Sequence, residues 1–156
     1  MSAADPSSYF VNEVMTASPQ RLRLMLIDGC LRYLHETKTH WEQNRFDLGG
    51  ESIDRARAIV SELITSINRE QLPEVTNRLV DLYTYLLKTL VEAGFTHEQK
   101  LIDDVIRVML IERDTWRLVC ETLAAQQMPA PHIPQSRPAA PIEMATDFSG
   151  GFSVEA

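Results

Sequence analysis

Apolar residues recur every three or four positions along four stretches of this chain, and turn-forming residues separate the stretches. This spacing is typical of amphipathic helices, whereas a β-strand would alternate apolar and polar residues. The predicted helices cover residues 19 to about 43, 51 to 67, 73 to 94, and 97 to about 125. Helices of this length joined by short turns predict an all-α fold, an antiparallel up-and-down four-helix bundle.

Residues with capping roles mark several of the predicted helix ends. Ser18 is a good N-cap because its hydroxyl accepts a hydrogen bond from a free backbone N–H. Pro19 follows at the first helical position, where a missing N–H costs nothing. The glycines at 49–50 are predicted to form the connection before the second helix. Thr96 and Gln99 have the spacing of a capping box at the start of the fourth helix.

The first predicted helix is apolar on two faces, although one apolar face is enough to join a bundle. The second face needs a second partner, which is either another helix of this chain or a helix of another protein. The first face carries Leu22, Met25, Leu26, Cys30, Tyr33 and Leu34, and the second carries Leu24, Ile27, Leu31 and Leu34.

A head of residues 1–17 precedes the bundle domain of residues 18–127. It carries Tyr9 and Phe10 in a segment too short to hold a core of its own. Exposed, each aromatic would leave roughly 150–250 Å² of mostly apolar surface in water, so we expect both to pack on the bundle. The contact would be either a fixed clasp that stabilises the fold or a movable cap over a binding groove.

The tail, residues 128–156, differs in composition from the rest of the chain. It holds five of the eight prolines, which remove backbone donors and block helices. No apolar periodicity offsets the cost of ordering, so the tail is predicted to be disordered. Its apolar residues form either a short docking motif or part of a solvated segment: Ile142, Met144, Phe148, Phe152 and Val154.

Composition excludes several classes of protein. The net charge is −7 and no basic cluster is present, which argues against nucleic-acid binding. No run approaches the roughly 20 apolar residues of a membrane span, and the N-terminus lacks the features of a signal peptide. Cys30 and Cys120 are most simply small core residues in a reducing compartment, although the sequence leaves a disulfide open.

No pattern in the chain predicts a catalytic residue, a cofactor or a metal site. Glu-x-x-His, His-Glu-x-x-His, Cys-x-x-Cys and the glycine-rich phosphate loop are all absent from the sequence. The enzymatic alternative is a histidine phosphotransfer bundle, which needs an exposed helical histidine beside a small residue. His35 and His40 have bulky neighbours, and His97 and His132 are predicted to lie in a turn and in the tail.

The residues between positions 9 and 116 form a recognisable series. It starts with the aromatic head and segment 14–19 and continues through 22–34, where residues 24–29 read Leu-Met-Leu-Ile-Asp-Gly. Its later members are Gly50, Glu51, Ala56, Ile59, Glu62, Leu63, Leu79, Leu82, Tyr83, Tyr85, Leu90, Ala93, Val105, Leu110, Arg113, Thr115 and Trp116. In this series the chain resembles the flagellar secretion chaperone FliS family, the export chaperones for flagellin. It departs from the family at Ile27, where tyrosine is usual, and at Gly94, where asparagine is usual.

The resemblance implies a cytoplasmic chaperone that is not an enzyme. It would bind the disordered C-terminal region of flagellin, prevent premature polymerisation and assist delivery to the flagellar export apparatus. Such binding is helix-in-groove recognition coupled to folding. We expect the groove to use apolar positions off the main bundle stripes, with Tyr9 and Phe10 as its cap. The groove positions are Leu24, Ile27, Leu31, Ile53, Ile64, Tyr83 and Leu87.

Two alternatives from other classes stay open. One is a bundle adaptor that binds a different export substrate or a regulator, and a pull-down with flagellin separates it from the flagellin chaperone. The other is the phosphotransfer bundle, which phosphohistidine labelling would detect.

Overall fold

The structure is a computed structural model that describes residues 5–129, and the predicted all-α class is confirmed for this part of the chain. The described residues form five helices and no strand. The helices are α1 (Pro6–Thr16), α2 (Pro19–Glu42), α3 (Phe46–Thr65), α4 (Pro73–Thr96) and α5 (Gln99–Gln127).

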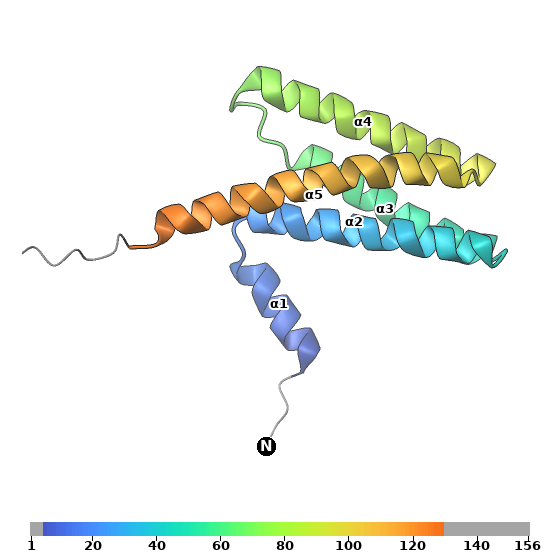
Figure 1. Ribbon diagram of the computed structural model, residues 1–156, viewed down its shortest axis with the longest axis horizontal. Helices are drawn as coiled ribbons and strands as arrows, with labels where there is room; N and C mark the ends of the chain where they lie inside the picture. The colour runs from blue at the N-terminus through green and yellow to red at the C-terminus, as the bar shows by residue number, and fades with distance from the viewer. Residues whose placement is uncertain (1–4, 130–156) are drawn as a thin grey trace, which may run out of the picture.

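Helices α2 to α5 form the body of the protein. Helix α2 packs against α3 and α5, and α4 packs against the same two helices. The order of colours in Figure 1 shows that α2 and α4 run one way while α3 and α5 return. Helices α4 and α5 lie close together at their junction and splay apart toward the other end of the body (Figure 1).

Helix α2 begins as the sequence predicts. The backbone N–H of Arg21 donates to Ser18 Oγ at 3.2 Å, and Pro19 occupies the first turn. Most of both apolar faces is covered within the chain, because α3 lies against one side and α5 against another, while Leu22, Met25 and Leu26 near the start of the helix stay half-buried. The two-faced pattern of α2 therefore reflects its central position.

Helix α3 begins at Phe46, so the prediction that the glycines at 49–50 connect two helices is wrong. Gly49 and Gly50 both lie inside the helix. A Cβ on Gly49 would sit 2.4 Å from Trp41 Nε1, so this glycine lets α3 approach the indole ring closely. Glycine at a helix interior often has such a packing reason, and the prediction took it for a turn signal.

The predicted capping box at the start of the last helix is also wrong. Thr96 is the final residue of α4, and Gly94 lies within that helix rather than after it. His97 ends α4 in the left-handed conformation, with φ of 55°, and its N–H donates to the Ala93 carbonyl at 2.8 Å. A histidine here takes the role that glycine usually has at a helix C-terminus.

The head contains a helix, α1, that was not predicted from the sequence. Asp5 caps it by accepting from the Ser7 N–H at 3.0 Å, and Pro6 follows at the first position. The expectation that Tyr9 and Phe10 pack on the body is wrong in this structure, since their exposed fractions are 72% and 58%. Figure 1 shows α1 projecting away from the other helices.

The two cysteines are free thiols rather than a disulfide. Cys30 is fully buried, as predicted for a core residue, and Cys120 is half-buried. None of the described helices is long and apolar enough to cross a membrane. The predictions made for residues 130–156 lie outside the described residues.

Candidate partner-binding site

The predicted groove residues do not form an exposed surface. They were chosen as apolar positions off the main bundle stripes, but most of them are buried. For the three on α2, the reason is that this helix has partners on both sides. Ile64 and Leu87 are half-buried against the core. The rest have exposed fractions of 4% or less: Leu24, Ile27, Leu31, Ile53 and Tyr83. Whether any of them contacts flagellin stays a prediction.

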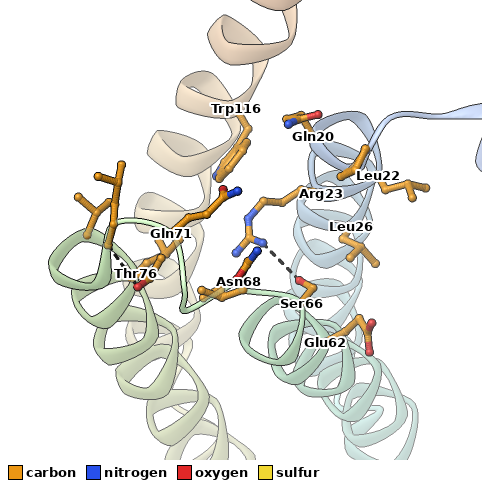
Figure 2. A pocket seen from close by; sticks show the side chains of 15 residues that line it. Gln20, Leu22, Arg23, Leu26, Glu62, Ser66, Asn68, Gln71, Thr76 and Trp116 are labelled. Carbon is orange, nitrogen blue, oxygen red and sulfur yellow. Dashed lines mark hydrogen bonds between the residues drawn. The ribbon is translucent and has the colours of Figure 1, made fainter.

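A largely apolar hollow opens where α2 begins, α3 ends and α4 begins (Figure 2). We call it the Arg23 hollow, and its volume is about 520 Å³. Trp116 of α5 closes one side of it. Its apolar lining is Pro19, Leu22, Leu26, Ile67, Leu72, Val75, Leu79 and Trp116, and its polar lining is Gln20, Arg23, Glu62, Ser66, Asn68, Gln71 and Thr76.

The connection between α3 and α4 shapes the rim of this hollow. Leu72 precedes α4 in the left-handed conformation, with φ of 48°, which is uncommon for a bulky residue. Pro73 then starts the helix. Leu72 and Val75 are 73% and 61% exposed, so two large apolar side chains stand at the mouth of the hollow in contact with water.

Arg23 reaches into the hollow from α2 and is only 9% exposed. It donates to the Leu63 carbonyl at 3.2 Å and to Ser66 Oγ at 3.3 Å. Its guanidinium carbon lies 4.9 Å from the centre of the Trp116 ring and 5.4 Å from that of Tyr83. These cation–π contacts and hydrogen bonds tie α2 to the end of α3 and to two further helices.

Tyr83 is a buried structural residue beside Arg23. Its hydroxyl donates to Glu112 Oε2 at 2.6 Å. Burial, followed by the hydrogen bond and the charge of Glu112, raises the pKa of Tyr83 above its ordinary value. The phenol therefore stays neutral and acts as a donor to the Glu112 side chain.

Arg23 is not among the groove residues predicted from the sequence, which are all apolar or aromatic. Arg23 lies between Leu22 and Leu24, on a helix whose neighbouring positions are apolar on two faces. A charged residue bordered by two apolar stripes was the available signal for a buried charge, since such a side chain has little room to reach water.

A second hollow lies on the other side of the α2 N-terminus, against the last turns of α5. We call it the Cys120 hollow, and its volume is about 630 Å³. Gln20 lines both hollows, so the two are neighbours. Its lining mixes apolar and charged side chains: Ser18, Gln20, Arg21, Leu24, Asp28, Arg117, Cys120, Glu121, Leu123, Ala124 and Gln127.

Helix α1 adds exposed apolar surface at the same end of the body. No residue of α1 is buried. A Glu13–Arg21 ion pair of 3.2 Å links it to α2. Its largest exposed apolar side chains are Tyr9, Phe10, Val11 and Met15.

The histidines do not gather into a site in the described part of the chain. His35 is exposed on α2, and His97 contacts the rings of Trp41 and Phe46. Within residues 5–129, no three His, Cys, Asp or Glu side chains come together as a metal site would need.

Comparison with known proteins gives consistent matches. The family model described as "Flagellar protein FliS" matches residues 1–123. The flagellar secretion chaperone FliS of Campylobacter jejuni is 30% identical over 113 residues, which cover 72% of this chain and 88% of that protein. The FliS of Escherichia coli is 30% identical over 105 residues, which cover 67% of this chain and 77% of that protein.

A likeness in structure accompanies the likeness in sequence. A crystal structure of a bacterial flagellar chaperone superposes with a TM-score of 0.64 and 18% identity. The match covers 76% of this chain and 99% of that one. At this level of identity the comparison concerns the fold.

Proposed function

The chain belongs to the FliS family of flagellar secretion chaperones, and we propose that it binds the C-terminal region of flagellin. A general chaperone role in flagellar export comes with the family. The proposal adds the client, the site and the compartment. In the cytoplasm the protein would cover the client, prevent premature polymerisation and assist its delivery to the export apparatus.

One observation carries the proposal: the buried residues of α4 and α5 are confined to one half of each helix. On α4 they lie between Tyr83 and Ala93, and on α5 between Ile102 and Met109. The apolar period continues in the other halves, where no residue is fully buried. These exposed or half-buried apolar residues include Val75, Leu79 and Leu82 on α4, and Ile111, Trp116, Leu118 and Leu123 on α5.

Apolar periodicity without burial is typical of a helix face that receives a partner. A flagellin segment that folds into a helix could place its apolar side against these faces. The body would then act as a platform, which we take to be an antiparallel four-helix bundle. Such recognition depends on apolar contact and coupled folding rather than on a catalytic group or a cofactor.

The hollows suggest which residues the client contacts first. We propose the apolar rim of the Arg23 hollow, with Leu22, Leu26 and Val75 as contacts. Among the groove residues predicted from sequence, Leu24 also lines the Cys120 hollow. The buried members of that set support these contacts from beneath, since they pack the helices that carry the rim.

Tyr9 and Phe10 remain our proposed groove cap. Helix α1 joins α2 through Ala17 and Ser18, next to both hollows. Its exposed aromatics are apolar enough to cover the hollows and to be displaced by a client. A short, unpacked helix of this kind is well suited to a movable cap.

A binding comparison tests the proposal. Purified chain is titrated with full-length flagellin from the same organism and with flagellin that lacks its C-terminal region. We expect a 1:1 complex with the full-length protein and no measurable binding of the truncated one. Equal binding of both forms would contradict the proposed client segment. Binding of another export substrate alone would favour the adaptor alternative.

A further inference from the structure

We propose that the Arg23 hollow recognises a helical, mostly apolar segment through an Asp or Glu side chain that pairs with the Arg23 guanidinium. The inference rests on the proposed function, because the segment belongs to the flagellar client. It adds the chemistry by which that segment is selected.

Arg23 carries a buried charge that its own neighbours do not balance. It takes part in none of the ion pairs formed within the part of the chain that the structure describes. Its Nε atom is buried and has no hydrogen-bond partner there. The rings of Trp116 and Tyr83 offset part of the cost of burying the cation, but a ring face is a weaker partner than a carboxylate.

The nearby acidic residues are engaged or directed elsewhere. Glu112 accepts the Tyr83 hydroxyl at 2.6 Å. Glu62 lines the hollow but forms no ion pair within the described residues, and Figure 2 shows its carboxylate pointing away from Arg23. The charge of Arg23 is therefore available to a carboxylate that enters from outside.

The surroundings of Arg23 would strengthen such a pair and make it selective. Leu22, Leu26, Leu72 and Val75 line the hollow, so a bound segment would exclude water from the guanidinium. Hydrogen bonds between ionised partners are stronger than neutral ones, and low polarity strengthens them further. An apolar helix without an acid would cover the cation and leave it unpaired, which disfavours that helix.

The test uses the full-length chain, flagellin from the same organism and titration calorimetry. Arg23→Met removes the charge and keeps an unbranched apolar side chain. Arg32→Met is the matched control on the same helix, because Arg32 has 66% of its side chain exposed and lines neither hollow. In flagellin, each Asp and Glu of the C-terminal region is changed singly to the amide.

We expect Arg23→Met to weaken binding by about 30-fold or more, as truncating one partner of a buried charge pair does. Arg32→Met should stay within about twofold of the unaltered chain because an exposed charge contributes little. One client amide should weaken binding to the unaltered chain and have no further effect on Arg23→Met, which is the signature of a direct pair. Circular dichroism checks that Arg23→Met is folded. If it is not, the client amides tested on the unaltered chain still decide.

The contrary outcomes are separable. If flagellin binds the unaltered chain and no client amide weakens it, the inference is wrong while the proposed function stands. Tighter client binding by Arg23→Met would mean that an acidic segment of this chain occupies the hollow. A dimer that Arg23→Met dissociates would identify a second copy as the occupant. No binding of flagellin by the unaltered chain would contradict the proposed function and the inference together.

Discussion

At the scale of single residues, Trp41 shows how one close contact fixes three parts of the body. Its ring lies against Gly49 of α3, where a Cβ would be 2.4 Å from Nε1. The His97 ring meets the same indole edge-on, with centroids 5.3 Å apart. The end of α2, the start of α3 and the turn between α4 and α5 therefore share one rigid aromatic side chain.

This contact predicts opposite effects for two neighbouring glycines. Gly49→Ala should destabilise the fold by about 1–3 kcal/mol, because an added methyl overpacks against a rigid ring. Gly50→Ala is the control, since no atom lies within 4 Å of a Cβ built there. It should stabilise the helix by up to about 1 kcal/mol. Urea unfolding followed by circular dichroism measures both, and equal effects would show that Gly49 has no packing role.

Cys30 gives a second prediction at this scale, concerning alkaline pH. Burial raises the pKa of this thiol from 9.0 to about 12. Below pH 9 the thiol is protonated in both states, whereas between pH 9 and 12 the unfolded state loses its proton first. Because deprotonation then favours the unfolded chain, the free energy of unfolding should fall as the pH rises through this window.

Between pH 8 and 10 the fall due to Cys30 should be about 1.4 kcal/mol. Urea unfolding of the unaltered chain and of Cys30→Ala at both pH values isolates it by difference. Cys30→Ala should lose less stability than the unaltered chain over this interval, although it starts lower because of the cavity. An identical decline in both proteins would mean that the thiol is not shielded from water.

At the scale of helices, the start of α2 was predicted correctly from the sequence, whereas the roles of the glycines were not. Ser18 and Pro19 fix the start of α2 through local hydrogen bonding and φ, which need no knowledge of the tertiary fold. Gly49 misled the prediction because its reason lies in Trp41, a residue on another helix. His97 misled it because a side chain held between two rings takes a conformation usually left to glycine.

Helix α1 was missed for a different reason. Asp5 and Pro6 are a recognisable helix start, but the two aromatics Tyr9 and Phe10 favoured the prediction of a head packed on the bundle. Burial of an aromatic is a tendency of folded chains, and a helix that meets a partner keeps its aromatics exposed until then. The sequence therefore contained the signal for a helix, but it contained no signal that this helix would stay unpacked.

Removing part of α1 distinguishes a cap from a clasp. Deleting residues 1–12 should leave the melting temperature unchanged, because α1 buries none of its residues. A cap that is closed half of the time lowers client affinity about twofold and stabilises the fold by only about 0.4 kcal/mol, so the deletion should tighten binding by that factor with almost no change in the melting temperature. Differential scanning calorimetry and titration with flagellin measure the two quantities.

The double variant Tyr9→Ser and Phe10→Ser is the control that keeps the length of the head. It should tighten binding like the deletion if the aromatics form the cap. A lower melting temperature in either variant would indicate a clasp instead. Weaker binding would mean that α1 holds the client rather than competing with it.

At the scale of the whole molecule, the two ends of the body are built differently. One end is closed by Trp41, Gly49 and His97. The other holds the Arg23 and Cys120 hollows, the end of α1 and the half of α4 that has no buried residue. Stability therefore concentrates at the closed end, and the open end keeps apolar surface free for a partner.

This division explains why the site resisted prediction. The sequence identifies apolar positions on a helix, but the partner of each face depends on how that helix is rotated and where its neighbours end. Ile27 and Val75 are both apolar, yet Ile27 is fully buried and Val75 is 61% exposed. Val75 lies in the first turn of α4, and the first half of this helix stands apart from α5.

Three charge substitutions therefore test the division of the molecule. Val75→Asp should keep the fold within about 0.5 kcal/mol, since the residue is exposed and an acid suits the first turn of a helix. It should weaken flagellin binding by about tenfold or more, because a desolvated charge would enter the apolar rim. Tyr85→Asp is the matched control, because Tyr85 is similarly exposed, at 60%, but lies in the half of α4 that carries the buried residues and lines neither hollow, so it should change neither property. Ile27→Asp should unfold the protein, since it places an unpaired charge in the core. Calorimetric titration and thermal unfolding measure all three, and equal binding losses at Val75 and Tyr85 would move the client surface away from the hollow.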